Sequence, residues 1–320
     1  MEEWAVDESR SCPIELIAAA AAETKHSNET RAMNLLVQAI LSGLMLGAVY
    51  TSLGIGLVLI YRTARFLNLA HGETFAITGI AAVLLTVAGL PLWVALGMAA
   101  VAALGFASGF YYLVVRPRRA WPVSSLILIS LAAAFLARGG MIVLAGPDPV
   151  SFPALFSGMP FRIASGAMPR QGLALVVFGF GISAAVGIFL SATRSGKELL
   201  ATAENPYAAE LLWVNVERAR LLAFAISGLL GALAAILLIP LIAIDFQSGL
   251  AMTLRGFIAG AISGMSPVGV LASGLGLGLF ESMVGAYLGA LFQDPVVFCV
   301  LILVAVWQSR KIRFGGGSRA

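Results

Sequence analysis

The residues with functional chemistry are few, and three of them stand together in the stretch Asn68-Leu69-Ala70-His71-Gly72-Glu73. An ionisable side chain within an apolar segment costs free energy, so it marks a functional site unless a simpler role explains it. Asn68 and His71 are three residues apart and share one face of a helix, whereas His71 and Glu73 do not. We keep two interpretations: a functional polar site within the apolar segment, or anchoring at the cytoplasmic end of the helix, which physical considerations alone favour.

Three further charged residues interrupt or open apolar segments. Arg138 stands about two thirds of the way outward along its segment, where it either snorkels to the outer surface or pairs with another buried charge. Glu281, within Leu279-Phe280-Glu281-Ser282, is the partner that we expect for the second case. Arg255 opens its segment and is interpreted as interfacial.

The sequence predicts no catalytic, metal or cofactor site. Cys12 and Cys299 lie in unlike contexts, and His26 and His71 lie in segments of different type. The phosphate-binding pattern G-x-x-x-x-G-K-[ST] does not occur, so we expect this chain to bind no ATP itself. A membrane enzyme would need clustered His, Asp or Cys, and this alternative is therefore disfavoured.

The most informative polar stretch is the loop 196–215, which reads as two short helices. Asn205 is placed to cap the second helix, with Pro206 at its first position. Ala208, Leu211 and Leu212 share one face at spacings of three and four. Such a helix favours a docking ridge for a soluble partner, and a solvated connector with a helical turn is the alternative.

The elements that position these residues must lie in a membrane. The chain has 320 residues, of which 60% are hydrophobic and 11% charged, whereas soluble domains hold roughly 25% charged residues. Its mean hydropathy is +0.96, and long unbroken apolar runs are typical of transmembrane helices. The 35 glycines suit close helix packing in a bilayer. We expect an all-α polytopic membrane protein and no nucleic-acid partner.

About eight apolar segments follow Met33, and the seventh is broken. Gly264-Met265-Ser266-Pro267 interrupts it, and proline removes a backbone donor and clashes with the preceding turn. The halves 253–264 and 268–284 are therefore expected to form a re-entrant hairpin. The segments run roughly over residues 35–60, 70–89, 92–115, 124–145, 172–192, 220–243, 253–284 and 289–308.

Basic residues set the expected orientation, because positive loops stay in the cytoplasm. Placing the loops 61–69, 116–123 and 193–220 and the C-terminal tail inside puts thirteen basic residues there. The outer loops after Met33 then keep only Arg162 and Arg170. This asymmetry predicts a cytoplasmic C-terminus.

The two ends of the chain differ from the apolar body. Residues 1–32 hold seven acidic and three basic residues, so their net charge is −4 and that of the remainder is +8. We interpret 1–32 as a disordered extension or a misassigned start, 33–314 as the transmembrane domain and 315–320 as a flexible cytoplasmic tail.

The chain from Asn34 to about Phe314 resembles the permeases of branched-chain amino-acid ABC importers of the Liv type, and the resemblance rests on four patches. The first is Gly43 to Tyr50 followed by Gly54 to Tyr61, and the second, Asn68 to Glu73, is similar to N-F-A-H-G-[DE]. The third is the loop 196–215, and the fourth runs from Arg255 through Gly264 and Gly269 to Glu281.

The resemblance implies roles for particular residues. Those implied in coupling to an ATPase are Lys197, Glu204, Asn205, Ala208, Ala209, Leu211, Leu212 and Asn215. Those implied on the translocation path or in its signature are Asn68, His71, Glu73, Gly264, Ser266, Gly269 and Glu281. Two departures stand out: Trp213 occupies a position where the family usually has glycine, and Met265 replaces the second glycine of the broken segment.

The resemblance also implies an assembly in the bacterial inner membrane. It comprises two permease subunits, of which this chain is one and a related chain the other, two ATP-binding subunits and an extracytoplasmic substrate-binding protein. The substrates implied are branched-chain amino acids or related small polar solutes such as urea, amides and aromatic acids. The main alternative is a secondary transporter or channel that works alone, which would normally place more charged relay residues near the midplane.

Overall fold

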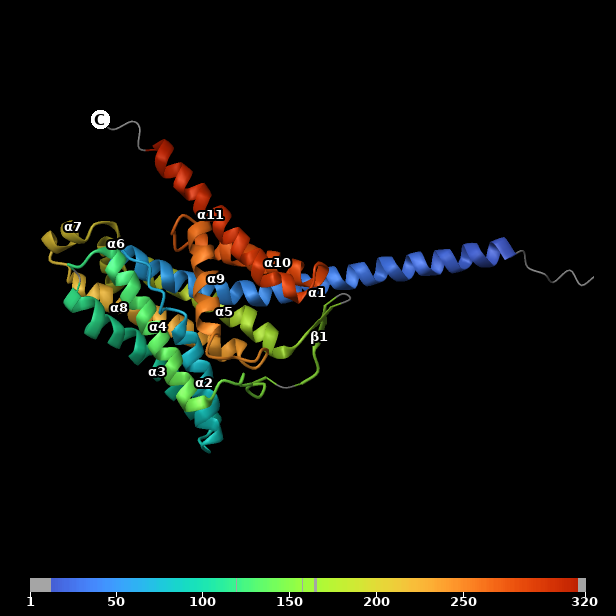
Figure 1. Ribbon diagram of the computed structural model, residues 1–320, viewed down its shortest axis with the longest axis horizontal. Coiled ribbons are helices and arrows are strands. Elements are labelled where there is room, and N and C mark those ends of the chain that lie inside the picture. The colour runs from blue at the N-terminus through green and yellow to red at the C-terminus, as the bar shows by residue number, and fades with distance from the viewer. Residues whose placement is uncertain (1–12, 119, 157, 164–165, 316–320) are drawn as a thin grey trace, which may run out of the picture.

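The computed structural model describes residues 13–118, 120–156, 158–163 and 166–315, and almost all of its regular structure is helical (Figure 1). Six of the described helical stretches are long and apolar enough to cross a membrane, and three shorter apolar helices accompany them. The predicted all-α polytopic class is therefore confirmed. The eleven α-helices in the described part of the chain are α1 (Pro13–Ala64), α2 (Glu73–Val87), α3 (Leu92–Phe110), α4 (Val123–Ala145), α5 (Arg170–Ala192), α6 (Arg194–Glu204), α7 (Pro206–Leu211), α8 (Val216–Leu238), α9 (Ser248–Ile262), α10 (Gly269–Tyr287) and α11 (Gln293–Gly315).

Short elements complete the connections. A single π-helical turn, η1 (Tyr111–Val115), and the 3₁₀ turn η2 (Arg116–Arg118) extend α3, and the 3₁₀ turn η3 (Ala290–Phe292) precedes α11. Strands β1 (Phe161–Ile163) and β2 (Gly166–Met168) form an antiparallel hairpin between α4 and α5, with Arg162 paired to Ala167.

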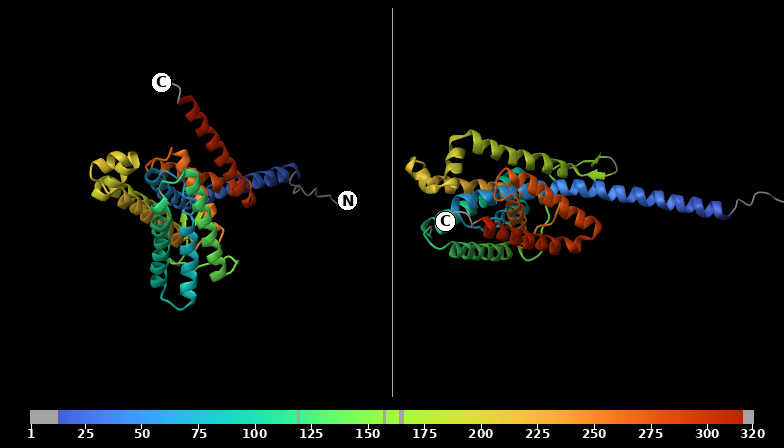
Figure 2. Two further views of the ribbon diagram at one scale, coloured as in Figure 1. Left: turned by 60° about the vertical axis from the view of Figure 1, so that its left-hand side comes forward. Right: turned by 90° about the horizontal axis from the view of Figure 1, so that it is seen from above.

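Helix α1 is the central element, and α10 lies antiparallel along it. The approach is close because glycines meet: a Cβ added to Gly43 would lie 2.7 Å from Cα of Leu279, and Gly278 packs directly on the backbone of Gly47. Small residues allow such contacts between helices in a bilayer. In the view from above, α5 lies on the opposite side of α1 and α8 from α3 (Figure 2).

Helices α2 and α9 are too short to cross a bilayer. Each has 15 residues, which corresponds to about 22 Å of helix against a hydrocarbon core of about 30 Å. Their N-termini meet inside the bundle, where the Gly72 amide donates to Oγ1 of Thr253 over 2.8 Å. The predicted second segment therefore begins within the bundle, after the non-helical residues 65–72.

The predicted break of the seventh segment is confirmed as two helices, α9 and α10, joined by residues 263–268. They lie side by side, and Oγ of Ser273 on α10 donates to the carbonyl of Ala259 on α9 over 2.6 Å. Helix α9 begins at Ser248, five residues before the predicted boundary, and the Ser248 amide donates to Oδ1 of Asp245, which lies just before the helix.

The expected domain boundaries at the two ends stay predictions. Residues 1–12 and 316–320 lie outside the described residues, and helix α1 begins at Pro13, within the segment interpreted as an extension. The first part of α1 projects beyond the bundle (Figure 1).

Candidate functional site

The stretch Asn68–Glu73 lies deep in the bundle. The side chains of Asn68, His71 and Glu73 are buried, with exposed fractions of 4%, 2% and 0%. His71 contacts the carbonyl of Leu53, which lies eleven residues before the end of α1 at Ala64. At 1.5 Å per residue, this places the His71 ring about 16 Å from the end of α1, a distance of about half the thickness of a hydrocarbon core. The interpretation as an interfacial anchor is therefore wrong, because the chain turns inward after Ala64.

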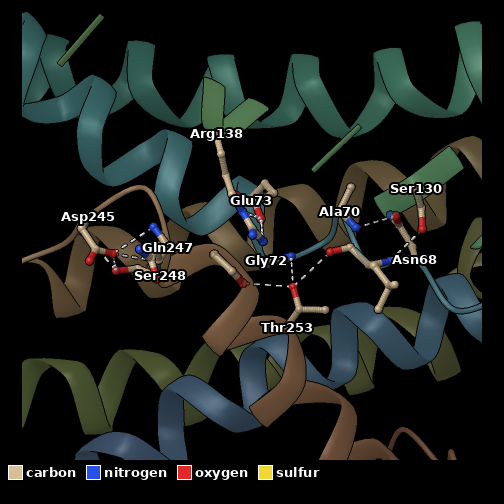
Figure 3. Close-up of polar contacts among 12 residues, drawn as sticks. Asn68, Ala70, Gly72, Glu73, Ser130, Arg138, Asp245, Gln247, Ser248 and Thr253 are labelled. Carbon is tan, nitrogen blue, oxygen red and sulfur yellow. Dashed lines mark hydrogen bonds and ion pairs between the residues drawn. The ribbon is translucent and has the colours of Figure 1, made fainter. Parts of the chain in front are cut away.

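Hydrogen bonds fix this stretch from two other helices, α4 and α9, and from within the stretch itself (Figure 3). Oδ1 of Asn68 accepts from the Ala70 amide over 3.1 Å, and the Leu69 amide donates to Oγ of Ser130 on α4 over 3.0 Å. Thr253 on α9 holds the Gly72 amide. A non-helical backbone at this depth needs such partners, since no lipid can supply them.

His71 has a structural role. Its Nε2 lies 3.0 Å from the Leu53 carbonyl, which only accepts, so Nε2 carries the hydrogen. Its Nδ1 then accepts from the hydroxyl of Ser227 on α8 over 2.7 Å. Because both ring nitrogens are occupied, His71 ties α1 to α8 and offers no free group to a solute.

Glu73 forms a buried ion pair with Arg138 of α4. Oε1 of Glu73 accepts from Nε and Nη2 of Arg138 over 2.9 and 2.6 Å, and the Arg138 side chain is 11% exposed. The expected pairing of Arg138 with Glu281 and its snorkelling are therefore both wrong. Oε2 of Glu73 has no hydrogen-bond partner within the described part of the chain, and it packs against Gly249, where any added Cβ would overlap it.

Glu281 pairs instead with Arg255, across the α9–α10 hairpin. Nε and Nη2 of Arg255 donate to Oε1 of Glu281 over 3.1 and 2.8 Å, and Nη2 also reaches Oδ1 of Asp294 on α11 over 2.7 Å. The guanidinium lies 5.9 Å from the ring centroid of Tyr50. With a side chain only 12% exposed, Arg255 is not the interfacial residue that the sequence suggested.

The two arginines line one cavity of about 440 Å³ beside the N-terminal half of α9. Its polar lining carries both signs of charge, and its wall is apolar. At the N-terminus of α9, Oδ1 of Asp245 accepts from the amides of Gln247 and Ser248 (Figure 3). The lining residues are Arg138, Asp245, Gln247, Ser248, Leu250, Ala251, Leu254, Arg255, Asp294, Val297 and Phe298.

The predicted path residues therefore fall into two groups. Asn68, His71 and Glu73 cluster within the bundle, where Glu73 binds the cavity-lining Arg138, and Glu281 binds the cavity-lining Arg255. Gly264, Ser266 and Gly269 lie at the far end of α9, at the turn between α9 and α10. Sequence reasoning missed Thr253, Asp245 and Asp294, whose only signal was a polar side chain at the edge of an apolar run.

Helices α6 and α7 form the predicted two-helix loop. Oδ1 of Asn205 caps α7 by accepting from the Ala208 amide over 3.1 Å, and Pro206 takes the first position, as predicted. Oδ1 of Asn215 caps α8 in the same way. Lys197, Glu204, Ala208, Leu211 and Leu212 are exposed, whereas Ala209 is buried against the molecule and so cannot belong to the outward face.

The two residues that depart from the family pattern, Trp213 and Met265, adopt a left-handed backbone conformation. Trp213 has φ 60° and Met265 has φ 59°, beside Gly264 at φ 64°. Glycine adopts this conformation freely, and other residues adopt it with strain. The geometry thus explains why the pattern has glycine at these positions. Trp213 is also 97% exposed, in the connection between α7 and α8.

The long apolar helices, with polar side chains buried between them, define a multi-spanning membrane protein. The chain belongs to the family described as branched-chain amino acid transport system / permease component, which matches residues 39–306. The members of this family serve ABC importers, so the chain is not a transporter that works alone.

Three relatives illustrate the similarity. The high-affinity branched-chain amino acid transport system permease protein LivH of Escherichia coli (strain K12) is 26% identical over 283 residues, which are 84% of this chain and 92% of that protein. The corresponding protein BraD of Pseudomonas aeruginosa is 26% identical over 294 residues, 86% of this chain and 95% of that protein. The autoinducer 2 import system permease protein LsrC of Enterobacter sp. (strain 638) is 32% identical over 186 residues, 57% of this chain and 50% of that protein. No match was found among solved structures.

Proposed function

We propose that this chain is one of two membrane-spanning subunits of an ATP-driven importer for branched-chain amino acids or related small polar solutes. Its partners are two ATP-binding subunits that hydrolyse the ATP, a second, related permease and an extracytoplasmic substrate-binding protein. The assembly sits in a bacterial inner membrane with the α6–α7 loop and the C-terminus in the cytoplasm. The basic residues of the loops after α1 and α3 support this orientation.

The cavity beside α9 is the observation that carries the substrate proposal. Arg138 and Arg255 supply cations, Asp245 and Asp294 supply carboxylates, and Leu254 and Phe298 belong to an apolar wall. A zwitterion with an aliphatic side chain complements such a lining in charge and in polarity. The relatives that import autoinducer 2 make that solute a second candidate cargo, and the paired opposite charges favour the zwitterion.

The loop of α6 and α7 supports the proposed coupling to an ATPase. Tyr207, Leu211, Leu212 and Trp213 expose 73%, 68%, 74% and 97% of their surface at one end of the molecule. A cluster of large, exposed apolar side chains indicates a surface that binds a protein partner. In the complex, ATP-driven closure of the partner subunits moves this loop, and the helices rock to open the path inward.

A cavity-filling variant tests the substrate proposal. The assembled importer is reconstituted in liposomes, and uptake of radiolabelled leucine is compared between wild type and Ala251→Phe, which places an aromatic ring in the cavity. We expect leucine uptake to fall at least tenfold at unchanged assembly. Ala132→Phe, at an exposed position of α4, is the matched control and should transport normally. Equal leucine uptake by Ala251→Phe and wild type would rule out this cavity as the solute site.

A further inference from the structure

Arg65 occupies an unusual backbone position at the end of α1. Its φ is 62°, and its amide closes the helix by donating to the Tyr61 carbonyl over 2.9 Å. Glycine is the residue that normally ends a helix in this conformation. A non-glycine residue held there points to a role for its side chain.

The guanidinium of Arg65 binds the end of α6. Nη2 donates to the carbonyls of Ala203 and Glu204 over 2.7 and 2.8 Å. The last carbonyls of a helix lack donors of their own and carry the negative end of its dipole, so a cation there is stabilising. Pro206 at the start of α7 has no amide hydrogen to offer. Arg65 thus holds the joint between α6 and α7 against the end of α1.

Residues 65–72, which we term the strap, lead directly from this joint to the buried polar site. Phe66 is 1% exposed, and its ring lies 6.4 Å from that of Phe224 on α8. Further on, the Leu69 amide is bonded to Ser130 and the Gly72 amide to Thr253. The strap is not helical, and eight residues connect the α6–α7 joint to Glu73.

We propose that Arg65 is a positioning residue that transmits movement of the α6–α7 loop through the strap to Glu73 and Thr253. The proposal rests on the proposed function, because an ATPase must supply the movement. A displacement of the joint pulls on the end of the strap, since two charge-assisted bonds link them. The other end of the strap is bonded to α9, so the N-terminus of α9 shifts relative to the Glu73–Arg138 pair and the cavity beside it.

The alternative route is rigid packing of α6 against α5 and α8, in which Arg65 only stabilises the joint. The two routes differ in the number of ATP molecules hydrolysed per solute imported. Breaking a transmitting contact raises this ratio in an assembled complex. A merely structural contact changes the amount of complex and leaves the ratio as it was.

The test uses the complete importer in liposomes, with ATPase activity and solute uptake measured on the same sample. Arg65→Asn removes the guanidinium and keeps a residue that tolerates positive φ. Arg62→Gln removes the same charge one turn earlier on α1 and serves as the control. We expect Arg65→Asn to raise the ATP-to-solute ratio at least tenfold, Arg65→Lys to restore part of the coupling, and Arg62→Gln to match wild type.

A wild-type ratio in assembled Arg65→Asn would overturn the proposal, as would a loss of coupling in Arg62→Gln equal to that in Arg65→Asn. If Arg65→Asn does not assemble, the ATP-to-solute ratio is measured in Thr253→Val instead. This variant acts at the other end of the strap, because it removes the acceptor of the Gly72 amide. A raised ratio there supports transmission, and an unchanged ratio overturns it. A wild-type complex that imports solute without ATP would instead refute the proposed function itself.

Discussion

At the residue scale, the buried charges pair differently from what their sequence positions suggest. Glu73 binds Arg138 from α4, and Glu281 binds Arg255 from α9. The sequence marked three of these four side chains as candidates because charges inside apolar segments are rare. It could not give the pairs, since each partner comes from a different helix and the pairing depends on how the helices pack.

The Glu73–Arg138 pair is expected to contribute to stability as a unit. Glu73→Gln removes one charge and leaves Arg138 buried without its counter-ion, which costs about 3–5 kcal/mol. The double variant Glu73→Gln/Arg138→Met should recover most of this loss. Thermal unfolding of the purified protein in detergent measures both. Glu198→Gln, which breaks the exposed Arg194–Glu198 pair, is the control and should change stability by at most about 1 kcal/mol.

The left-handed position of Trp213 permits a second test at this scale. Trp213→Gly relieves the strain of φ 60° and loses almost no packing, so we expect a gain of up to about 1 kcal/mol in unfolding free energy. The control is Leu212→Gly, next to it at φ −92° and 74% exposed, which should destabilise. Equal destabilisation by both variants would contradict the strain argument.

At the element scale, the apolar runs predicted most helices, and the proline at the seventh segment predicted the break between α9 and α10. The caps Asn205 and Pro206 also predicted α7 correctly, because capping is a local interaction. The half-length of α2 was not predicted. The predicted segment began at residue 70, whereas residues 65–72 are held out of a helix by the local bond of Asn68 to the Ala70 amide and by partners on other helices, Ser130 and Thr253.

The exposed face of α7 is expected to hold the ATP-binding partner. Leu211→Asp/Leu212→Asp should lower the ATPase subunit recovered with the complex at least tenfold, and replacement of Glu204 should uncouple hydrolysis from uptake. Quantitative pull-down and uptake measure these effects. Leu291→Asp, at an apolar side chain that is 90% exposed within η3, is the control. Normal coupled uptake in the α7 and Glu204 variants would remove this loop from the mechanism.

At the scale of the whole molecule, charge asymmetry gives a testable orientation. Green fluorescent protein fused after the C-terminus should be fluorescent, because it folds in the cytoplasm. Alkaline phosphatase fused at the same place should be inactive, because it needs the periplasm. The physical reason is the excess of basic residues in the loops on the same side. Phosphatase activity at the C-terminus would invert the proposed topology.

The central claim is that this chain works as one subunit of an ATP-driven importer. The most direct test identifies the proteins that co-purify with it. The chain is tagged at its C-terminus, extracted gently in detergent, and the co-purifying proteins are identified by mass spectrometry. We predict recovery of an ATP-binding subunit and a second permease in stable proportion. A chain that purifies alone and still moves solute into liposomes without ATP would contradict the account.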